Sequence, residues 1–309
     1  MKILYIYSEY QGIYNYLEDW IIQSFKKKFE IVTISSSASI DEFNQIFKDN
    51  EINLIFTLMG VNIKKTVLEF LEQLPIPFCI WLTEDPFYID KSLNLMNYKN
   101  LFFTIDLGAY EFYANKGFKN IFYLPLGTDP DTFKQGQLDN SYKSDILILG
   151  YPYPARVNLA KLILENTDYQ LTLVGKGWYT QIPKRLRKTK KLIILDKWIP
   201  PASASLFYNS AKIVINHHRE PDFIYNKNSL FVQNKSINNR TFDITSCGAF
   251  QLIDYKEDLY NQYEEDEIVY YRNLSDCIEK ITHFINDDDA RRLISYKARN
   301  KVLNEHTWD

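Results

Sequence analysis

The chain has 309 residues, of which 46% are hydrophobic and 24% are charged, and its formal net charge is -3. This length exceeds one ordinary hydrophobic core and predicts two domains of about 150 residues each. The composition is that of a globular protein and excludes a disordered or fibrous chain. The slight negative charge gives no general attraction to nucleic acid, so we expect no nucleic-acid partner.

The cysteines and the N-terminal residues indicate the compartment. Cys79, Cys247 and Cys277 are an odd number without C-x-x-C spacing, which predicts neither a disulfide framework nor a zinc site. The first residues, "MKILYIYSEY", lack a basic leader with an apolar run, and no segment approaches the roughly 20 apolar residues of a membrane span. We therefore expect a cytoplasmic protein without a transmembrane segment.

The first part of the chain alternates short apolar runs with amphipathic segments. The patterns predict strands at 2–8, 30–36, 52–60, 77–85, 100–106 and 120–127. They predict helices at 16–29, 40–50, 64–74 and 109–117. Strands that alternate with helices indicate a parallel sheet covered on both faces.

A stretch rich in Gly, Asp, Asn and Ser, residues 127–145, interrupts this pattern and is typical of a linker. We therefore expect an N-terminal domain at 1–127, a hinge at 128–144, and a C-terminal domain at 145–309.

The same alternation resumes beyond the linker. The predicted strands are 145–150, 170–177, 191–198, 212–218, 249–254 and 267–272. The predicted helices are 155–166, 202–211, 238–248, 257–263 and 275–306, and a long polar loop covers 219–238. We predict two Rossmann-like, doubly wound α/β domains with a ligand cleft at the carboxyl ends of their strands.

The stretch "SINNRTFDITSCGAFQLID" places a charged pair in the first turn of a predicted helix. Asn238 or Asn239 can cap this helix, whose N-terminus, with Thr241, would cradle a phosphate. Arg240 can add a forked cationic donor to a diphosphate, and Asp243 can accept from a ribose diol. The alternative is that Arg240 and Asp243 only pair with each other and with the helix dipole.

Other candidate ligand contacts follow the strands of the second domain. Gly150 and Tyr151 begin a turn that leads to Arg156, and Lys176 lies between two glycines before Trp178. A plain turn with a surface arginine is the alternative, and the Gly-Lys-Gly run is not a Walker loop.

Two histidines and a basic run complete the candidates in this domain. His217 and His218 follow a strand, and as neighbours they face opposite ways, so donor contact or solvation is expected and a metal site is not. The basic run 183–191 is a solvated face or a surface that attracts an anionic acceptor or a membrane.

In the first domain, "WLTEDP" places two carboxylates at the end of a strand. Pro86 ends the strand and is expected to hold both carboxylates outward. A carboxylate at this place can act as a general base or as a group that orients a substrate. Asp85 is the first candidate and Glu84 the second, and the alternative is an acidic turn before a proline.

Several of these motifs together resemble the spore-maturation CgeB-like glycosyltransferases. The C-terminal half is similar in the Arg-x-Phe-acidic element at Arg240, in Cys247-Gly248, and in a final His-Thr-aromatic element that begins at His306. "WLTEDPFYID" and "YLPLGTDPDTF" are similar to the family's Trp-x-x-Asp-Asp-Pro element and hinge-entering strand. The resemblance covers nearly the whole chain.

This resemblance implies the GT-B fold and a metal-independent hexosyl transfer from a nucleotide-sugar. It implies that the C-terminal domain binds the donor, here expected to be a UDP-sugar, and that a protein or glycan acceptor binds the N-terminal domain. It places the nucleobase against Lys197, Trp198 and Ile199, although core packing is an alternative for Trp198. No further cofactor is expected. The expected catalytic residues are Asp85, Glu84, Arg156 and Arg240.

One departure keeps two alternatives open. Retaining enzymes of the related glycosyltransferase family 4 have a Glu seven or eight residues before a second Glu. Here Asp243 has no such partner, because Glu220 lies too far upstream. The alternatives are a non-catalytic nucleotide-sugar-binding or coat-associated protein and a UDP-sugar epimerase of the same fold.

Overall fold

The computed structural model describes residues 1–96 and 100–309, and internal contacts divide the chain into two compact units. Unit 1 contains residues 1–126, 221–236 and 308–309, and unit 2 contains residues 127–220 and 237–307. The expected hinge at 128–144 therefore groups with unit 2. Residues 221–236 and the last two residues group with unit 1, although the sequence placed them in the C-terminal domain.

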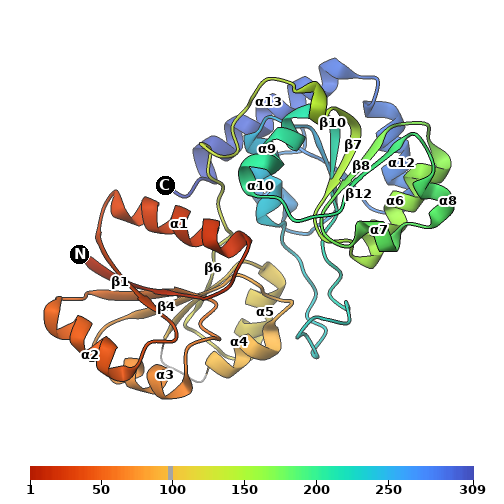
Figure 1. The fold of residues 1–309 in the computed structure, drawn as a ribbon. Coiled ribbons are helices and arrows are strands. Elements are labelled where there is room, and N and C mark those ends of the chain that lie inside the picture. The colour runs from red at the N-terminus through yellow and green to blue at the C-terminus, as the bar shows by residue number, and fades with distance from the viewer. Residues whose placement is uncertain (97–99) are drawn as a thin grey trace. The chain divides into compact units, whose positions relative to one another are not determined.

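Unit 1 is built on a parallel sheet with the strand order β2-β1-β3-β4-β5-β6 (Figure 1). The strands are β1 (Lys2–Tyr7), β2 (Glu30–Ser35), β3 (Leu54–Leu58), β4 (Phe78–Leu82), β5 (Leu101–Thr104) and β6 (Ile121–Tyr123). The helices are α1 (Ile13–Lys26), α2 (Ile40–Asp49), α3 (Lys65–Glu72), α4 (Ile89–Leu95) and α5 (Leu107–Asn115).

Helices cover both faces of this sheet because successive side chains of each strand point to opposite faces. Leu4 and Ile6 of β1 pack in the core on the side of α2 to α5. Ile3 and Tyr5 pack in the other core, against α1. In Figure 1, α1 accordingly lies across one face of the sheet and α2 and α3 across the other. The near-continuous apolar sequence of β1, β3 and β4 follows from this double burial.

The segment 221–236, which we call the strap, is hydrogen-bonded along unit 1. At one end, the backbone N–H of Lys227 donates to the carbonyl of Phe87 (2.8 Å), and that of Asp90 donates to the carbonyl of Lys227 (2.9 Å). At the other end, the backbone N–H groups of Lys235 and Ser236 donate to Asp106 Oδ2 at 3.1 and 3.0 Å. Val232 joins the core of unit 1. The long polar loop of the sequence is therefore an ordered part of this unit.

Unit 2 repeats the doubly wound plan with the strand order β12-β11-β10-β7-β8-β9. The strands are β7 (Ser144–Leu149), β8 (Leu171–Val174), β9 (Leu192–Leu195), β10 (Ala211–Asn216), β11 (Gln251–Asp254) and β12 (Val269–Tyr271). The helices are α6 (Pro154–Asn166), α7 (Trp178–Gln181), α8 (Lys184–Arg187), α9 (Pro201–Ser210), α10 (Asn239–Ser246), α11 (Leu259–Gln262), α12 (Leu274–Phe284) and α13 (Asp288–Glu305), with the 3-10 turn η1 (Asn140–Tyr142).

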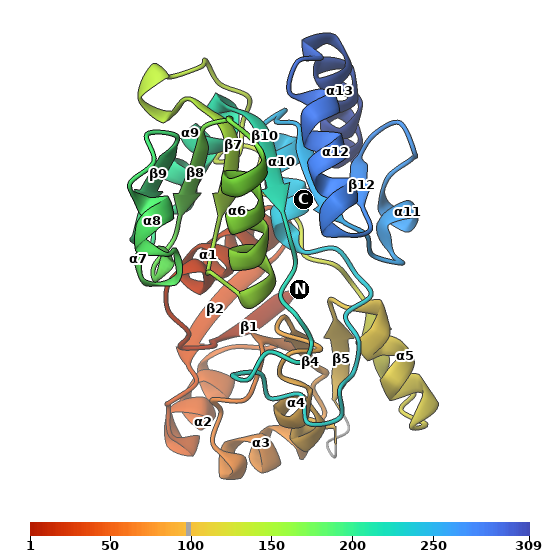
Figure 2. The same ribbon diagram turned by 90° about the vertical axis from the view of Figure 1, so that its right-hand side faces the viewer.

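Helices also lie on both faces of the second sheet. α6 packs beside α12, and α10 packs beside α9 and α13 (Figures 1 and 2). Their starts follow local chemistry: Pro154 and Pro201 are first-turn prolines, and Asn273 caps α12 by accepting from the N–H of Asp276 at 3.0 Å. The order of strands reverses between β7 and β10, and this switch point is where doubly wound sheets bind ligands.

The structure differs from the predicted elements in a few places. It contains α4, α7 and α8, which lie outside the predicted helices, because short helices give little periodic signal. It breaks the helix predicted at 275–306 at residues 285–287, where Asp287 caps α13 by accepting from the N–H of Ala290 (2.9 Å). β6 is three residues long, much shorter than the run 120–127.

We predict that Asp106→Ala will loosen the strap. Asp106 caps α5 through the N–H of Ala109 (3.0 Å) and also accepts from the strap, so its loss leaves several buried N–H groups unpaired. We expect the free energy of unfolding to fall by about 3 kcal/mol. Limited proteolysis should cut within 221–236 faster. Asp139→Ala, which removes a capping carboxylate on the surface of unit 2, is the control and should do neither. An unchanged cleavage rate would contradict the prediction.

Candidate anion site at the carboxyl edge of the second sheet

Arg156 connects the two strand ends that meet at the switch point of unit 2. It lies in the first turn of α6, directly after the carboxyl end of β7. Its Nε donates to the carbonyl of His217, just beyond β10, at 2.6 Å, and one terminal nitrogen donates to the carbonyl of Tyr151 at 3.1 Å. The guanidinium also lies 5.0 Å from the ring centroid of Tyr153. Arg156 is only 3% exposed, so these contacts fix its position.

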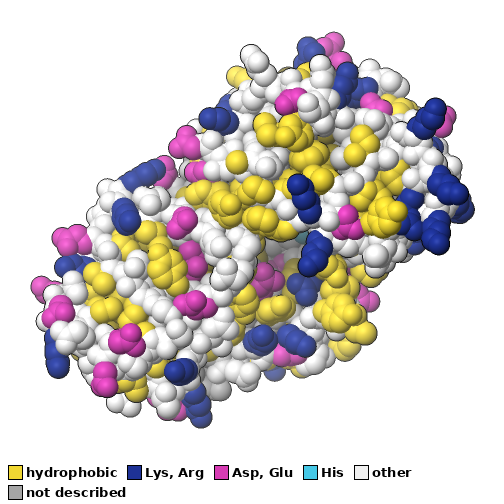
Figure 3. Space-filling view, in the orientation of Figure 1, with side chains coloured by type: hydrophobic (Ala, Val, Ile, Leu, Met, Phe, Trp, Pro, Cys, Tyr) yellow, Lys and Arg dark blue, Asp and Glu magenta, His cyan; other side chains and the backbone are white. Residues whose placement is uncertain are grey.

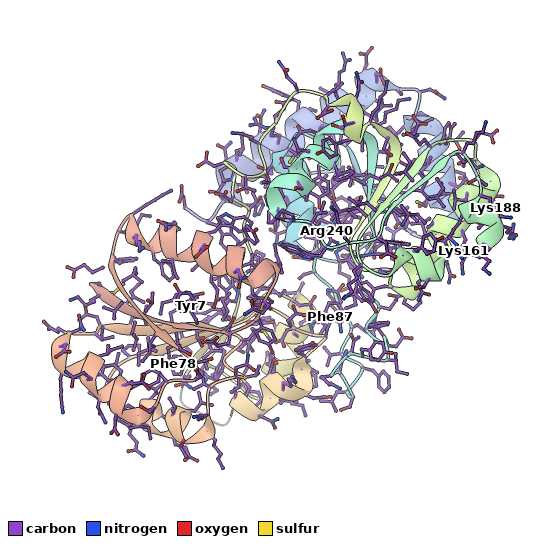
Figure 4. The ribbon with its side chains drawn as sticks, in the orientation of Figure 1. Tyr7, Phe78, Phe87, Lys161, Lys188 and Arg240 are labelled. Carbon is purple, nitrogen blue, oxygen red and sulfur yellow. The ribbon has the colours of Figure 1, made fainter. Side chains whose placement is uncertain are left out.

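A second guanidinium reaches the same point from α10. Arg240, labelled in Figure 4, belongs to the first turn of this helix. A Cβ built on Gly150 would lie 2.8 Å from a terminal nitrogen of Arg156 and 3.1 Å from one of Arg240. Gly150 has φ +131°, a conformation that other residues rarely adopt. Because glycine has no side chain, the guanidinium groups of Arg156 and Arg240 can both lie next to residue 150.

The proximity of the two guanidiniums has an electrostatic consequence. Burial, and after it the positive charge of Arg240, lower the pKa of Arg156 to about 10. Both effects disfavour the charged form, although the side chain remains charged at neutral pH. An anion bound between the two groups would relieve the repulsion and use their unfilled donor capacity. The site is thus chemically suited to a phosphate or diphosphate.

Trp178 supports this turn and is not exposed to a ligand. Its side chain is fully buried, and its Nε1 donates to the carbonyl of Gly150 at 2.9 Å. A Cβ on Gly175 would lie 2.2 Å from the same carbonyl oxygen. The prediction that Trp178 contacts the donor is therefore corrected: it positions Gly150 because a buried indole N–H needs an acceptor.

The first turn of α10 has the predicted capping chemistry. Asn238 is the N-cap and accepts from the backbone N–H of Thr241 at 3.2 Å. Asn239 is the first helical residue, and its side chain donates to Asp243 Oδ2 at 3.3 Å. Thr241 is fully buried, and its hydroxyl accepts from Asn216 at 3.0 Å. The sequence predicted Thr241 as part of a phosphate cradle, but its hydroxyl instead attaches the helix to β10.

Asp243 has a different environment from the one expected. It is 6% exposed, and its Oδ1 accepts from the hydroxyl of Thr128 at 2.7 Å while Oδ2 accepts from Asn239. Burial raises its pKa to about 7, against the opposing effects of the Thr128 hydrogen bond and the charge of Arg240. Asp243 thus anchors the start of the segment 127–144 to α10. The expected open acceptor for a ribose diol is not what the structure shows.

The two histidines have separate partners, as their alternation predicts. His218 is buried, its Nδ1 lies 2.6 Å from Asp254 Oδ1, and its Nε2 accepts from the backbone N–H of Asn238 at 3.1 Å. Burial lowers its pKa to about 4, so it is neutral and structural. His217 stacks on Tyr271 and its Nδ1 lies 2.7 Å from that hydroxyl. Among residues 1–96 and 100–309, no group of His, Cys, Asp or Glu side chains is arranged to hold a metal ion.

The remaining donor candidates lie on loops that follow neighbouring strands at the same edge. Tyr151 is half-exposed after β7, Lys176 is exposed after β8, and Trp198 is 51% exposed after β9. Because Trp198 is exposed, the structure argues against the alternative interpretation that this side chain packs in the core. Lys197 and Ile199 flank it, exposed and half-buried respectively. Because β7, β8 and β9 are adjacent, these loops are neighbours along the edge that carries Gly150.

Two hollows in unit 2 differ in their relation to this edge. One, of about 470 Å³, opens beside His217 between the start of α6 and the ends of β11 and β12, with Asp254 and Arg272 in its wall. The other, of about 420 Å³, lies at the opposite, amino edge between residues 135–143 and α9. None of the predicted site residues lines the second hollow. The predicted site residues therefore lie away from the amino edge, and the arginine pair belongs to the carboxyl edge of the sheet.

In unit 1 the two predicted carboxylates differ. Asp85 is 1% exposed and accepts from the hydroxyls of Ser92 (2.7 Å), Tyr113 (3.0 Å) and Thr104 (3.2 Å). Burial raises its pKa to about 7. The expectation that Pro86 holds both carboxylates outward is thus wrong for Asp85, because three hydroxyls draw it into the core.

Glu84 is the accessible member of the pair. It is half-buried, and its Oε1 accepts from the hydroxyl of Tyr14 at 3.1 Å. The hydroxyl of Tyr14 also lies 2.8 Å from Thr83. Of the two carboxylates, Glu84 is therefore the more accessible to a ligand.

Sequence reasoning missed several residues that shape the site. Thr128 binds Asp243, and Tyr208 of α9 forms a side-chain hydrogen bond with Arg240 that opposes the burial-raised pKa of the phenol. Asp254 pairs with His218, which holds its pKa well below the usual range. Asp254 and Thr128 had a signal, because Asp254 ends one predicted strand and Thr128 directly follows another. Tyr208 lies within a predicted helix, and no local pattern indicated that it would contact Arg240.

Comparison with known proteins agrees with this architecture. Residues 156–309 match the family model described as "Glycosyl transferase-like". The chain is 35% identical over 311 aligned residues to the "Spore protein CgeB" of Bacillus subtilis (strain 168). The alignment covers 100% of this chain and 96% of that protein. The chain belongs to the CgeB-like glycosyltransferases. The membership identifies it as an enzyme that transfers glycosyl groups from a nucleotide-sugar.

Solved structures show that this CgeB-like protein has the GT-B fold. Sucrose-phosphate synthase from Thermosynechococcus elongatus matches with a TM-score of 0.70 and 11% identity, over 99% of this chain and 95% of that one. Anabaena Alr3699/HepE, solved in complex with UDP and glucose, matches with a TM-score of 0.69 and 11% identity, over 100% and 96%. At this identity the likeness concerns the fold. Within the described residues of the CgeB-like chain, no helix has the length and apolar character needed to cross a bilayer.

We predict that Asp243→Asn will flatten part of the pH dependence of stability. The folded pKa of Asp243, about 7, lies above the ordinary value near 3.9 of an unfolded chain. Its contribution is complete below pH 4 and is lost as the pH rises through 7, because unfolding then releases a proton. Urea denaturation at several pH values should show the wild type losing more stability than the variant between pH 4 and 8. Parallel curves would contradict the assigned environment.

Proposed function

We propose that unit 2 binds a UDP-sugar and that its diphosphate lies between Arg156 and Arg240, beside Gly150. The observation that carries this proposal is the convergence of two guanidiniums on one glycine at the switch point of a parallel sheet. Bidentate guanidinium donors match phosphate oxygens, and the N-terminus of α10 adds a partial positive charge. The UDP of the Alr3699/HepE structure supports the choice of nucleotide.

The chemistry of the proposed reaction follows from where charge develops. The bond between the anomeric carbon of a hexose and the diphosphate oxygen breaks, and a bond to an acceptor oxygen forms. Negative charge then grows on the leaving diphosphate, where Arg156, Arg240 and Lys176 would stabilise it. Such preorganised electrostatic stabilisation is usually the largest single contribution to a rate enhancement. Because these cations can perform the role, we propose a reaction that needs no metal and no further cofactor.

We propose that the nucleoside binds against the loops after β8 and β9. Trp198 offers an exposed aromatic face, and Lys197 and Ile199 flank it. Asp243, with both oxygens engaged by Thr128 and Asn239, would act by holding α10, and so Arg240, in place.

On unit 1, we propose that Glu84 orients or deprotonates the acceptor hydroxyl. Its partner Tyr14 is a buried residue of α1 and holds one carboxylate oxygen in a fixed position. We further propose a protein or glycan acceptor, a cytoplasmic site of action and retention of the anomeric configuration. The anomeric proton signals of the product would test retention.

We predict that Arg240→Ala will weaken UDP binding at least tenfold, since a charge-assisted bidentate contact contributes about 1.5 to 3 kcal/mol. Isothermal titration with UDP and with uridine would measure the two affinities. The affinity for UDP should fall, and the affinity for uridine should not. Arg240→Lys should retain part of the affinity. Arg292→Ala, which changes an exposed arginine at the amino edge, is the control. Equal UDP affinities for wild type and Arg240→Ala would remove Arg240 from the site.

We predict that Glu84→Gln will lower the transfer rate by a factor of about 100 or more, as expected for loss of a general base. The dissociation constant for UDP should not change, because Glu84 belongs to unit 1. Single-turnover assays with the UDP-sugar and acceptor would measure the rate, and titration the affinity. Asp85→Asn is the comparison variant and should lower thermal stability, because Asp85 accepts from three buried hydroxyls. A normal rate for Glu84→Gln would exclude the proposed role.

A further inference from the structure

The strap, residues 221–236, exposes large apolar side chains to an unusual degree. Ile224 is 82% exposed, Tyr225 69%, Phe231 66% and Leu230 48%. Phe223 packs edge-on against Tyr225 with 5.3 Å between ring centroids. Figure 3 shows hydrophobic side chains gathered over the part of the molecule where Figure 1 draws the strap. Exposed apolar side chains grouped in this way commonly mark an interaction site.

These side chains project from a backbone that is held firmly. Ser229 donates to Asp90 through both its backbone N–H and its hydroxyl, each at 2.9 Å. Buried Asn228 donates to the carbonyl of Val232 at 2.9 Å and accepts from its N–H at 3.0 Å, which closes the loop. Together with the contacts to Asp106, these bonds order both ends of the strap. A preordered loop loses less entropy on binding a partner.

The local conformation also favours an outward display. Phe231 adopts φ +52°, a left-handed conformation that is rare for a bulky residue, and its neighbour Val232 enters the core of unit 1. Residues held in such conformations persist where the surroundings enforce them and are concentrated at functional sites. Here the fixed Val232 forces the preceding ring towards solvent.

The chemistry of the strap identifies the kind of partner. Several of its polar side chains are engaged within unit 1, since Asn226 donates to the carbonyl of Pro221 (2.9 Å), Ser229 binds Asp90, and Asn234 donates to Asp106. Apart from Ser229, the exposed side chains are the apolar ones named above together with Asp222, Lys227 and Gln233. Aromatic and aliphatic side chains accompanied by a few polar and charged ones are the composition of a protein–protein interface. A polypeptide segment with apolar side chains therefore fits this surface.

We propose that the strap is the docking surface for a polypeptide acceptor, which it holds through apolar side chains. This inference rests on the proposed function, in which a hydroxyl of the acceptor receives the sugar at unit 1. The strap is hydrogen-bonded to Phe87 and Asp90, a few residues beyond Glu84, so the surface is continuous with the loop of the proposed acceptor-side carboxylate. The contacts would select the protein to be modified and would not take part in the chemistry.

The experiment uses the full chain and a random dodecapeptide phage library as the probe. Peptides are selected on the wild type after depletion on the double variant Tyr225→Ser/Phe231→Asn, in which Asn suits the left-handed conformation. The matched control is Leu293→Ser/Tyr296→Ser on α13, which removes side chains of similar exposure, 57% and 66%, from unit 2. Melting temperature and UDP affinity are measured for each protein.

We expect apolar peptides that bind the wild type and the control equally and bind the strap variant at least tenfold more weakly. The UDP affinity and melting temperature of the strap variant should match the wild type. Failure to select any strap-dependent peptide would overturn the proposal. So would strap-dependent binding on a glycan array alone, or a wild-type dimer in sedimentation that the strap variant lacks. If the wild type did not bind UDP, that result would contradict the proposed donor site. Failure of the strap proposal and failure of the proposed function are therefore distinguishable.

Discussion

The convergence of two guanidiniums beside Gly150 is the constraint on which the proposed donor site depends. Like charges at such short range in a partly buried place are unfavourable unless the surroundings compensate, and here backbone carbonyls hold Arg156 while α10 holds Arg240. The glycine is required because any Cβ would occupy the space where their nitrogens meet. An anion would relieve a repulsion of this kind, which is the physical basis of the proposed phosphate site.

The supporting interactions are mostly buried polar contacts that fix the edge of the sheet. Trp178 holds the carbonyl of Gly150, His218 joins the end of β10 to Asp254 and to the cap of α10, and Asp243 ties Thr128 to the same helix. Each of these three buried side chains has a hydrogen-bond partner, because leaving such a group unpaired is costly. Several residues with chemically suggestive side chains are therefore scaffold, and the cationic groups they position carry the proposed chemistry.

The two units use carboxylates in different ways. Asp85 and Asp106 of unit 1 are buried acceptors whose pKa values burial raises to about 7 and about 6, whereas Glu84 remains accessible. Asp106 is also the residue that fastens the strap. Unit 1 thus combines buried carboxylates with an outer loop that exposes apolar side chains, an arrangement that suits the proposed docking of a partner segment.

The sequence alone determined the doubly wound α/β plan of both units, because runs buried on both faces must be continuously apolar and must alternate with amphipathic helices. It also located Gly150, Arg156 and Arg240, since strand ends and helix starts have local signatures. Tertiary structure decided which side chains remain accessible. Asp85 turns inward towards three hydroxyls, Trp178 is buried under Gly150, and residues 221–236 pack with unit 1. These outcomes depend on partners far away in the chain, such as Tyr113 for Asp85 and Asp106 for the strap, and no local pattern encodes such partners.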